Sequence, residues 1–131
     1  MDSTTDRKRT PKGSSKEHSV METIRKGYQG RDAALLASVY AEDVEFTICN
    51  RNNPPGKRLV LRGREAVRRM LEDLCAREMT HQMDNVTLGE GSIAFSTHCA
   101  YPDGCRVVAL NIATLKRGRI VSELSVDCWD E

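Results

Sequence analysis

Residues 79–129 read MTHQMDNVTLGEGSIAFSTHCAYPDGCRVVALNIATLKRGRIVSELSVDCW and contain four runs in which polar and apolar residues alternate. Gly-Glu-Gly, Pro-Asp-Gly and Arg-Gly separate the runs, and these residue types favour tight turns. The pattern predicts strands at about 79–88, 92–101, 105–116 and 119–129. Four strands joined in sequence by short turns form an antiparallel meander.

Three helical patterns precede the meander. The first covers residues 19–30, with Ser19 as the N-cap of a capping box. The second runs from the cap at Asp32 to residue 40, and the third covers residues 63–76, where apolar residues recur at helical spacing. Two shorter strand patterns lie at residues 44–49 and 58–62.

This order of elements predicts one α+β domain. We expect three N-terminal helices packed in the concave face of a strongly curved, mostly antiparallel sheet. Helices of this size do not fill such a cone, so an apolar cavity should remain at its wide end. The outer sheet face also needs a cover, and a second copy of the chain would give a homodimer.

The composition argues against several classes of partner. The chain has 131 residues with 20 Lys and Arg against 19 Asp and Glu, so no global field draws it to nucleic acid or a membrane. No apolar run approaches the roughly 20 residues that span a bilayer, and no secretory signal is apparent at the start. We therefore predict a cytoplasmic protein with reduced cysteines, a disordered tail at residues 1–17 and a domain at residues 18–131.

Four segments carry a resemblance to a known family. They are YAEDVEF at 40–46, LRGREAVRRML at 61–71, YPDGCRV at 101–107 and KRGRIVSELSVDCWDE at 116–131. The chain resembles the nuclear transport factor 2-like superfamily, close to its SnoaL-like branch, over about residues 20–131. The resemblance implies a cystatin-like cone. The superfamily includes ketosteroid isomerases, polyketide cyclases, dehydratases, epoxide hydrolases and proteins without known activity, so the resemblance says little about function.

At most positions where the resemblance implies a catalytic residue of the family, this chain has a different residue. The position that corresponds to the general base of ketosteroid isomerase is Ile48, and that of its protonated aspartate is about Ile112 or Ala113. Where SnoaL-type cyclases often carry His, Trp and Asp, this chain has Glu123, Leu124 and Ser125. The resemblance therefore argues against steroid isomerisation and weakens a cyclase assignment.

One sheet face in the meander can line the predicted cavity. If Tyr101 pairs with Cys105 across the Pro-Asp-Gly turn, the two-residue period places seven residues on one face. They are Phe95, Thr97, Cys99, Val107, Ala109, Asn111 and Ala113. Asn111 would then donate a hydrogen bond to a ligand carbonyl or be satisfied by the neighbouring helices.

The last strand has two possible registers. If Lys116 pairs directly with Arg119, then Ser122, Leu124, Val126 and Cys128 share the face of Asn111, and the alternation of apolar residues favours this register. If the turn takes three residues, that face receives Val121, Glu123, Ser125 and Asp127. In the second case Glu123 and Asp127 could act as general base and acid.

His81 is the best single titratable candidate, because imidazole exchanges protons near physiological pH. The alternative is a structural role, in which His81 bonds Asp84 or a helix end. Asp43 could orient His81, or could form part of an exposed acidic turn. The complete set of candidate catalytic residues is His81, Asp43, Glu123 and Asp127. The candidate ligand-binding residues are Tyr40, Phe46, Phe95, Thr97, Cys99, Asn111 and Trp129.

These observations predict a small-molecule pocket protein that binds a largely apolar ligand. Lyase, isomerase or hydrolase chemistry by acid and base groups would need no cofactor, and the His and Cys spacings predict no metal site. The alternative is a non-catalytic module of the same fold that binds a ligand or a partner.

Overall fold

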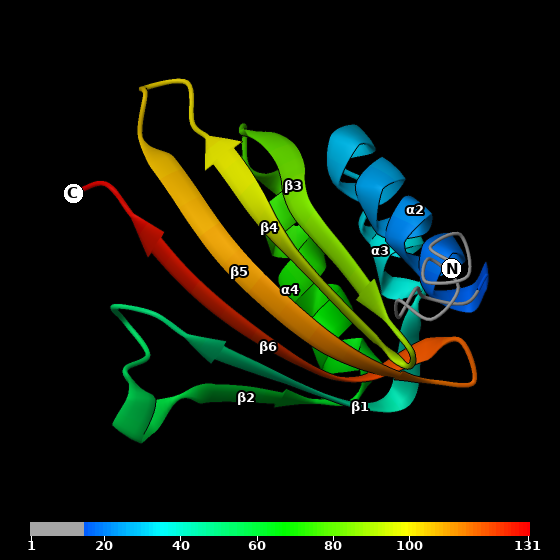
Figure 1. The fold of residues 1–131 in the computed structure, drawn as a ribbon. Coiled ribbons are helices and arrows are strands. Elements are labelled where there is room, and N and C mark those ends of the chain that lie inside the picture. The colour runs from blue at the N-terminus through cyan, green and yellow to red at the C-terminus, as the bar shows by residue number, and fades with distance from the viewer. Residues whose placement is uncertain (1–14) are drawn as a thin grey trace, which may run out of the picture.

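The computed structural model describes residues 15–131 and confirms the predicted α+β class. Its elements are α2 (Ser15–Gly30), α3 (Ala33–Ala37), β1 (Tyr40–Cys49), the 3-10 turn η1 (Pro55–Lys57), β2 (Leu59–Arg62), α4 (Arg64–Ala76), β3 (Thr80–Gly89), β4 (Ser92–Ala100), β5 (Arg106–Lys116) and β6 (Arg119–Trp129). The three helices lie along one side of a single twisted sheet, as Figure 1 shows.

The six strands follow the order β2-β1-β6-β5-β4-β3. Strands β3 to β6 form the antiparallel meander that the turn residues predict, and β1 pairs with β6 in parallel. The last strand therefore occupies the middle of the sheet (Figure 1).

The core lies between the helices and the sheet face that they cover, which we call the inner face. Side chains from all three helices and from the sheet join one buried cluster, which includes Ile24, Leu36, Val67, Leu71, Val44, Ile93, Phe95 and Ile120. No helix within residues 15–131 covers the opposite sheet face, here called the outer face (Figure 1).

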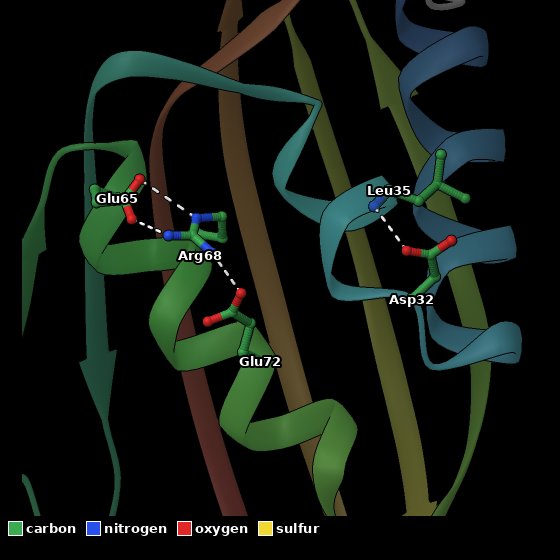
Figure 2. Close-up of polar contacts among 5 residues, drawn as sticks. All are labelled: Asp32, Leu35, Glu65, Arg68 and Glu72. Atoms are coloured by element: carbon green, nitrogen blue, oxygen red, sulfur yellow. Dashed lines mark hydrogen bonds and ion pairs between the residues drawn. The ribbon is translucent and has the colours of Figure 1, made fainter.

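Local interactions stabilise the individual helices, and one close contact joins α2 to α3. The Leu35 N–H donates to Asp32 Oδ1 at 3.0 Å, which caps α3 (Figure 2). On α4, Arg68 bonds both Glu65 and Glu72 (Figure 2). Gly27 is required where α2 meets α3, because a Cβ there would lie 2.5 Å from Leu36 Cγ.

Helix α2 begins at Ser15, inside the segment predicted as a tail. Ser19 is therefore an interior residue rather than an N-cap, and its carbonyl accepts a bond from Thr23 Oγ1. The helix extends this far because Glu17 is buried and accepts a hydrogen bond from the Gly91 N–H at 3.1 Å. Residues 1–14 of the predicted tail lie outside the described residues.

The second helix is shorter than predicted. It ends at Ala37, and the chain has already entered β1 at Tyr40, because the Ile120 N–H donates to the Val39 carbonyl and Tyr40 pairs with Ile120.

Within residues 15–131, no helix is long and apolar enough to cross a membrane. All five cysteines are free.

Candidate functional site

The turn before β6 matches one of the two predicted registers. Lys116 pairs with Arg119 across a two-residue turn, in which Arg117 and Gly118 have φ values of 54° and 76°. Positive φ at both central residues is the signature of a type I′ hairpin turn. From this turn alone, Leu124 and Val126 should face the cavity.

A β-bulge reverses that outcome. Leu115 pairs with Ile120 but Thr114 pairs with Ser122, so Val121 is an extra residue in β6. One extra residue moves every following side chain to the other face. The favoured prediction, with Ser122, Leu124, Val126 and Cys128 inside, is therefore wrong.

The bulge places a row of polar side chains on the inner face. Asn111 pairs with Ser125, Ala109 with Asp127 and Ala113 with Glu123, and the side chains of Asn111, Ser125 and Glu123 are buried. The pairing of Cys99 with Val107 and the Tyr101–Cys105 turn are as the sequence predicts.

These strands line a cavity of about 420 Å³ between the inner face, the ends of α2 and α4, and the loop after β1. Its apolar lining includes Phe46, Ile48, Met70, Leu74, Met79, Val107 and Trp129. Its polar lining from the sheet consists of His81, Thr97, Cys99, Asn111, Ser125 and Asp127. The cavity can hold a small, mainly apolar molecule and offers it several polar groups.

Three buried side-chain atoms in residues 15–131 have no hydrogen-bond partner: His81 Nε2, Glu123 Oε2 and Asp127 Oδ1. Buried polar atoms are nearly always paired in folded proteins, so an unpaired one needs an explanation. All three belong to residues that the sequence nominates for catalysis. His81 and Asp127 line the cavity, where a ligand can reach them.

Asp127 is half-buried in the wall of the cavity. Burial raises the pKa of its carboxyl group, and a hydrogen bond from the Asn50 side chain opposes the rise. A carboxylate that loses solvation in this way becomes a stronger base.

His81 lies directly opposite Cys99 on the neighbouring strand, and its Nδ1 is 3.1 Å from Cys99 Sγ. The Tyr28 ring packs beside it at a centroid distance of 5.5 Å. Burial, together with the positive charge of Arg31, lowers the pKa of the His81 imidazole, so the ring is neutral near pH 7.

Glu123 lies deeper in the inner face and is not part of the cavity wall. The Tyr40 hydroxyl donates to Glu123 Oε1 at 2.8 Å, and both residues are buried. Burial raises the pKa of Glu123 to about 8, against the bond from Tyr40 that lowers it. Glu123 is therefore mostly protonated at neutral pH.

Asp43 does not reach the site. It is exposed in an irregular part of β1, between Tyr40 and Glu45, where the pairing with β6 shifts register. The cavity, which His81 lines, lies at the other end of β1 next to Asn50, so the predicted contact between Asp43 and His81 is wrong. Phe95 and Tyr40 are buried in the core below the cavity and do not line it.

The sequence did not identify several residues around the cavity. Tyr28 comes from α2, and its helical spacing from Val20 and Ile24 was the available signal. At the rim, Arg77 bonds the Tyr101 hydroxyl at 3.2 Å and Asp73 at 2.6 Å. No local pattern indicates that these segments meet.

In the part of the chain that the structure describes, no group of three or more His, Cys, Asp or Glu side chains could hold a metal ion.

A family model for the SnoaL-like domain matches residues 21–123. The chain belongs to this family. A search of curated protein sequences found no match.

Solved structures share the fold of this SnoaL-like protein. A Kribbella flavida protein provisionally named a ketosteroid isomerase is 17% identical with a TM-score of 0.73, covering 90% of this chain and 80% of its own. A nuclear transport factor 2-like protein of unknown function from Mesorhizobium loti is 19% identical with a TM-score of 0.73, covering 88% and 93%.

An epoxide hydrolase of M. tuberculosis is 11% identical with a TM-score of 0.65, covering 89% of this chain and 84% of its own. At such identities, the likeness establishes the fold alone. The function must be argued from the site itself.

Proposed function

We propose that this SnoaL-like protein binds a small, largely apolar carbonyl compound in its cavity and moves a proton on it, with Asp127 as the general base and no cofactor. The observation that carries the proposal is the unpaired Oδ1 of Asp127 in the wall of an otherwise mainly apolar cavity. A bound C–H or O–H group supplies the missing partner of this atom.

In this proposal, Asn111 polarises the carbonyl group. Because Ala109 pairs with Asp127 and Asn111 with Ser125, Asn111 and Asp127 are diagonal neighbours on adjacent strands. Diagonal neighbours lie about 7–8 Å apart, which one carbonyl group and its adjacent carbon can bridge through two contacts. The Asn111 amide would donate to the carbonyl oxygen while Asp127 takes the proton from the α-carbon.

The fate of the proton decides the class of reaction. Return of the proton at another carbon gives an isomerase, and loss of a group from the β-carbon gives a lyase. The proposal is consistent with the names of two structural neighbours, a provisional ketosteroid isomerase and an epoxide hydrolase, both of which are named for reactions on small molecules.

Deuterium exchange tests the proposal without knowledge of the natural substrate. Steroid-, terpene- and polyketide-like ketones are first screened by thermal shift, since a ligand of the folded state raises its stability. Stabilising compounds are then incubated with the protein in D2O, and exchange at the α-carbon is followed by NMR. Asp127→Asn should lower the exchange rate by about a hundredfold or more.

Asp43→Asn is the matched control, because Asp43 is an exposed aspartate away from the cavity. It should leave exchange unchanged. The rate should fall on the acid side of an apparent pKa above the ordinary aspartate value of 3.8, because burial raises the pKa of Asp127. Stabilisation by ligands without exchange would favour the non-catalytic binding module, and no stabilisation by any compound would argue against the ligand pocket.

We also propose that two copies associate through the outer face. Leu110, Ile112, Leu124 and Val126 are 58%, 59%, 36% and 44% exposed. Leu110 pairs with Val126 and Ile112 with Leu124, so the four side chains form one continuous apolar patch. Burial against a second copy is the simplest way to remove this patch from water.

A further inference from the structure

Cys99 and His81 form a pair of groups that the proposed proton transfer does not use. They face each other across β3 and β4, with 3.1 Å between Cys99 Sγ and His81 Nδ1. Both line the cavity, and both also line a second hollow of about 600 Å³ at the adjacent rim of the sheet. A small molecule can therefore approach the sulfur, although the Cys99 side chain is largely buried.

The groups around the pair keep it neutral at rest. Burial raises the pKa of the Cys99 thiol, with the charge of Asp127 adding to the rise and a hydrogen bond with Thr97 opposing it. On the helix side, Tyr28 and Arg31 are the neighbours of His81, and its imidazole stays unprotonated. A thiol beside a free-base imidazole is the arrangement of a nucleophile that loses its proton as it attacks.

We propose that Cys99, with His81 as its base, is a nucleophile that adds to small apolar molecules carrying an α,β-unsaturated carbonyl group. The thiol proton passes to His81 Nδ1 as Sγ forms a bond to the β-carbon of the ligand. The C=C π electrons move to the α-carbon and carbonyl oxygen, and the imidazolium then returns the proton to the α-carbon. The product is a thioether, and no oxidant, reductant or leaving group is involved.

The surroundings suit this class of electrophile. Thiols add readily to soft carbon centres, and the addition requires only that one proton move from sulfur to carbon. Met79, Val107 and Trp129 line the cavity with Cys99 and can hold the hydrocarbon part of the ligand. The inference needs the cavity to be accessible but does not need Asp127 to be a base.

N-ethylmaleimide, an α,β-unsaturated imide, is the probe. The folded full chain is treated at neutral pH with less than one equivalent, and the modified cysteines are quantified by peptide mass spectrometry. Cys99 should react about tenfold or more faster than Cys128, although Cys128 is exposed and Cys99 is buried. Slower reaction at Cys99 than at Cys128 would overturn the proposal.

Substitution of the base tests the mechanism. His81→Ala should slow modification of Cys99 by about a hundredfold and leave Cys128 unaffected. Added imidazole should restore part of the rate, which a merely structural role of His81 would not allow. His18→Ala, at an exposed position of α2, is the matched control and should react like the parent protein.

His81→Asn serves as a second variant if His81→Ala does not give a cooperative thermal transition. An unchanged Cys99 rate in a folded His81 variant, or no recovery with imidazole, would refute the role of His81. These outcomes are separate from those of the deuterium-exchange assay. Deuterium exchange without Cys99 reactivity would refute only the role of Cys99 as a nucleophile. Cys99 reactivity without deuterium exchange would refute only the role of Asp127 as the general base.

Discussion

The two faces of strands β5 and β6 carry the opposite of the usual pattern. The inner face presents Asn111, Glu123 and Ser125 to the protein interior, whereas the outer face presents Leu110 and Ile112 to water. A half-buried sheet ordinarily has its apolar side chains inside and its polar ones outside. This inversion is the pattern that the two proposals require, namely a polar inner face for the proton transfer and an apolar outer face for association with a second copy.

Ile112→Lys tests the outer face and should have the largest effect. A two-fold interface carries each substitution twice, and an unpaired buried charge costs about 3 kcal/mol per copy, or roughly 6 kcal/mol in total. The Kd of the dimer should rise at least about ten-thousandfold, which sedimentation velocity over a concentration series would detect. Gln29→Lys, at an exposed position of α2 on the helix side of the sheet, is the control and should remain a dimer. A monomeric parent protein would disprove the proposed interface.

Glu123→Gln tests the inner face. Because the pKa of Glu123 is raised from 4.5 to about 8 on folding, the folded state retains a proton that the unfolded state releases between these values. The resulting stabilisation is complete below pH 4.5 and is lost as the pH rises to about 8. At 1.36 kcal/mol per pKa unit, the loss is on the order of 5 kcal/mol.

The free energy of unfolding is measured in urea at pH 4.5, 6 and 8 for both proteins. The parent protein should lose stability relative to Glu123→Gln as the pH rises, because glutamine keeps the acceptor for Tyr40 and does not titrate. Glu90→Gln, an exposed residue of the β3–β4 turn, is the control and should follow the parent curve. Parallel curves for the parent and Glu123→Gln would show that Glu123 is ionised in the folded state.

Asp32→Ala serves as a reference for the effect of one local interaction on the free energy of unfolding, because Asp32 lies on neither sheet face. Loss of the bond from the Leu35 N–H removes the N-cap of α3, which should lower the free energy of unfolding by about 1 kcal/mol. Urea denaturation would measure the change, and Asp32→Asn, which retains the cap, should behave like the parent. A change in oligomeric state or in pH dependence in Asp32→Ala would mean that the effects at the two faces are not specific.

The sequence predicted most of the strands because their ends carry local signals. Pro-Asp-Gly marks the turn around Gly104 and Arg-Gly marks the turn around Gly118, and both glycines adopt positive φ. The pairing of Lys116 with Arg119 follows from such a signal. The bulge at Val121 does not, because an extra residue in β6 is determined by pairing with β5 and leaves no mark in composition.

The same limit explains why the sequence predicted only part of the candidate site. The face that holds Asn111 and Cys99 follows from the two-residue period and one turn. The apolar alternation of β6 favours the other register, so the sequence predicts the inward position of Glu123 and Asp127 only through the less favoured alternative. Asp43 could orient His81 only if the two residues approached each other, but strand pairing puts them at opposite ends of the sheet.

The central position of β6 has a consequence for biosynthesis. The ribosome makes this strand after all the other strands that the structure describes, yet both β1 and β5 need it as a neighbour. Until it leaves the exit tunnel, the nascent polypeptide has two unpaired strand edges and an uncovered core, which are the features that chaperones bind. Ribosome stalling or premature termination before Arg119 should therefore yield aggregation-prone fragments rather than a shortened native domain.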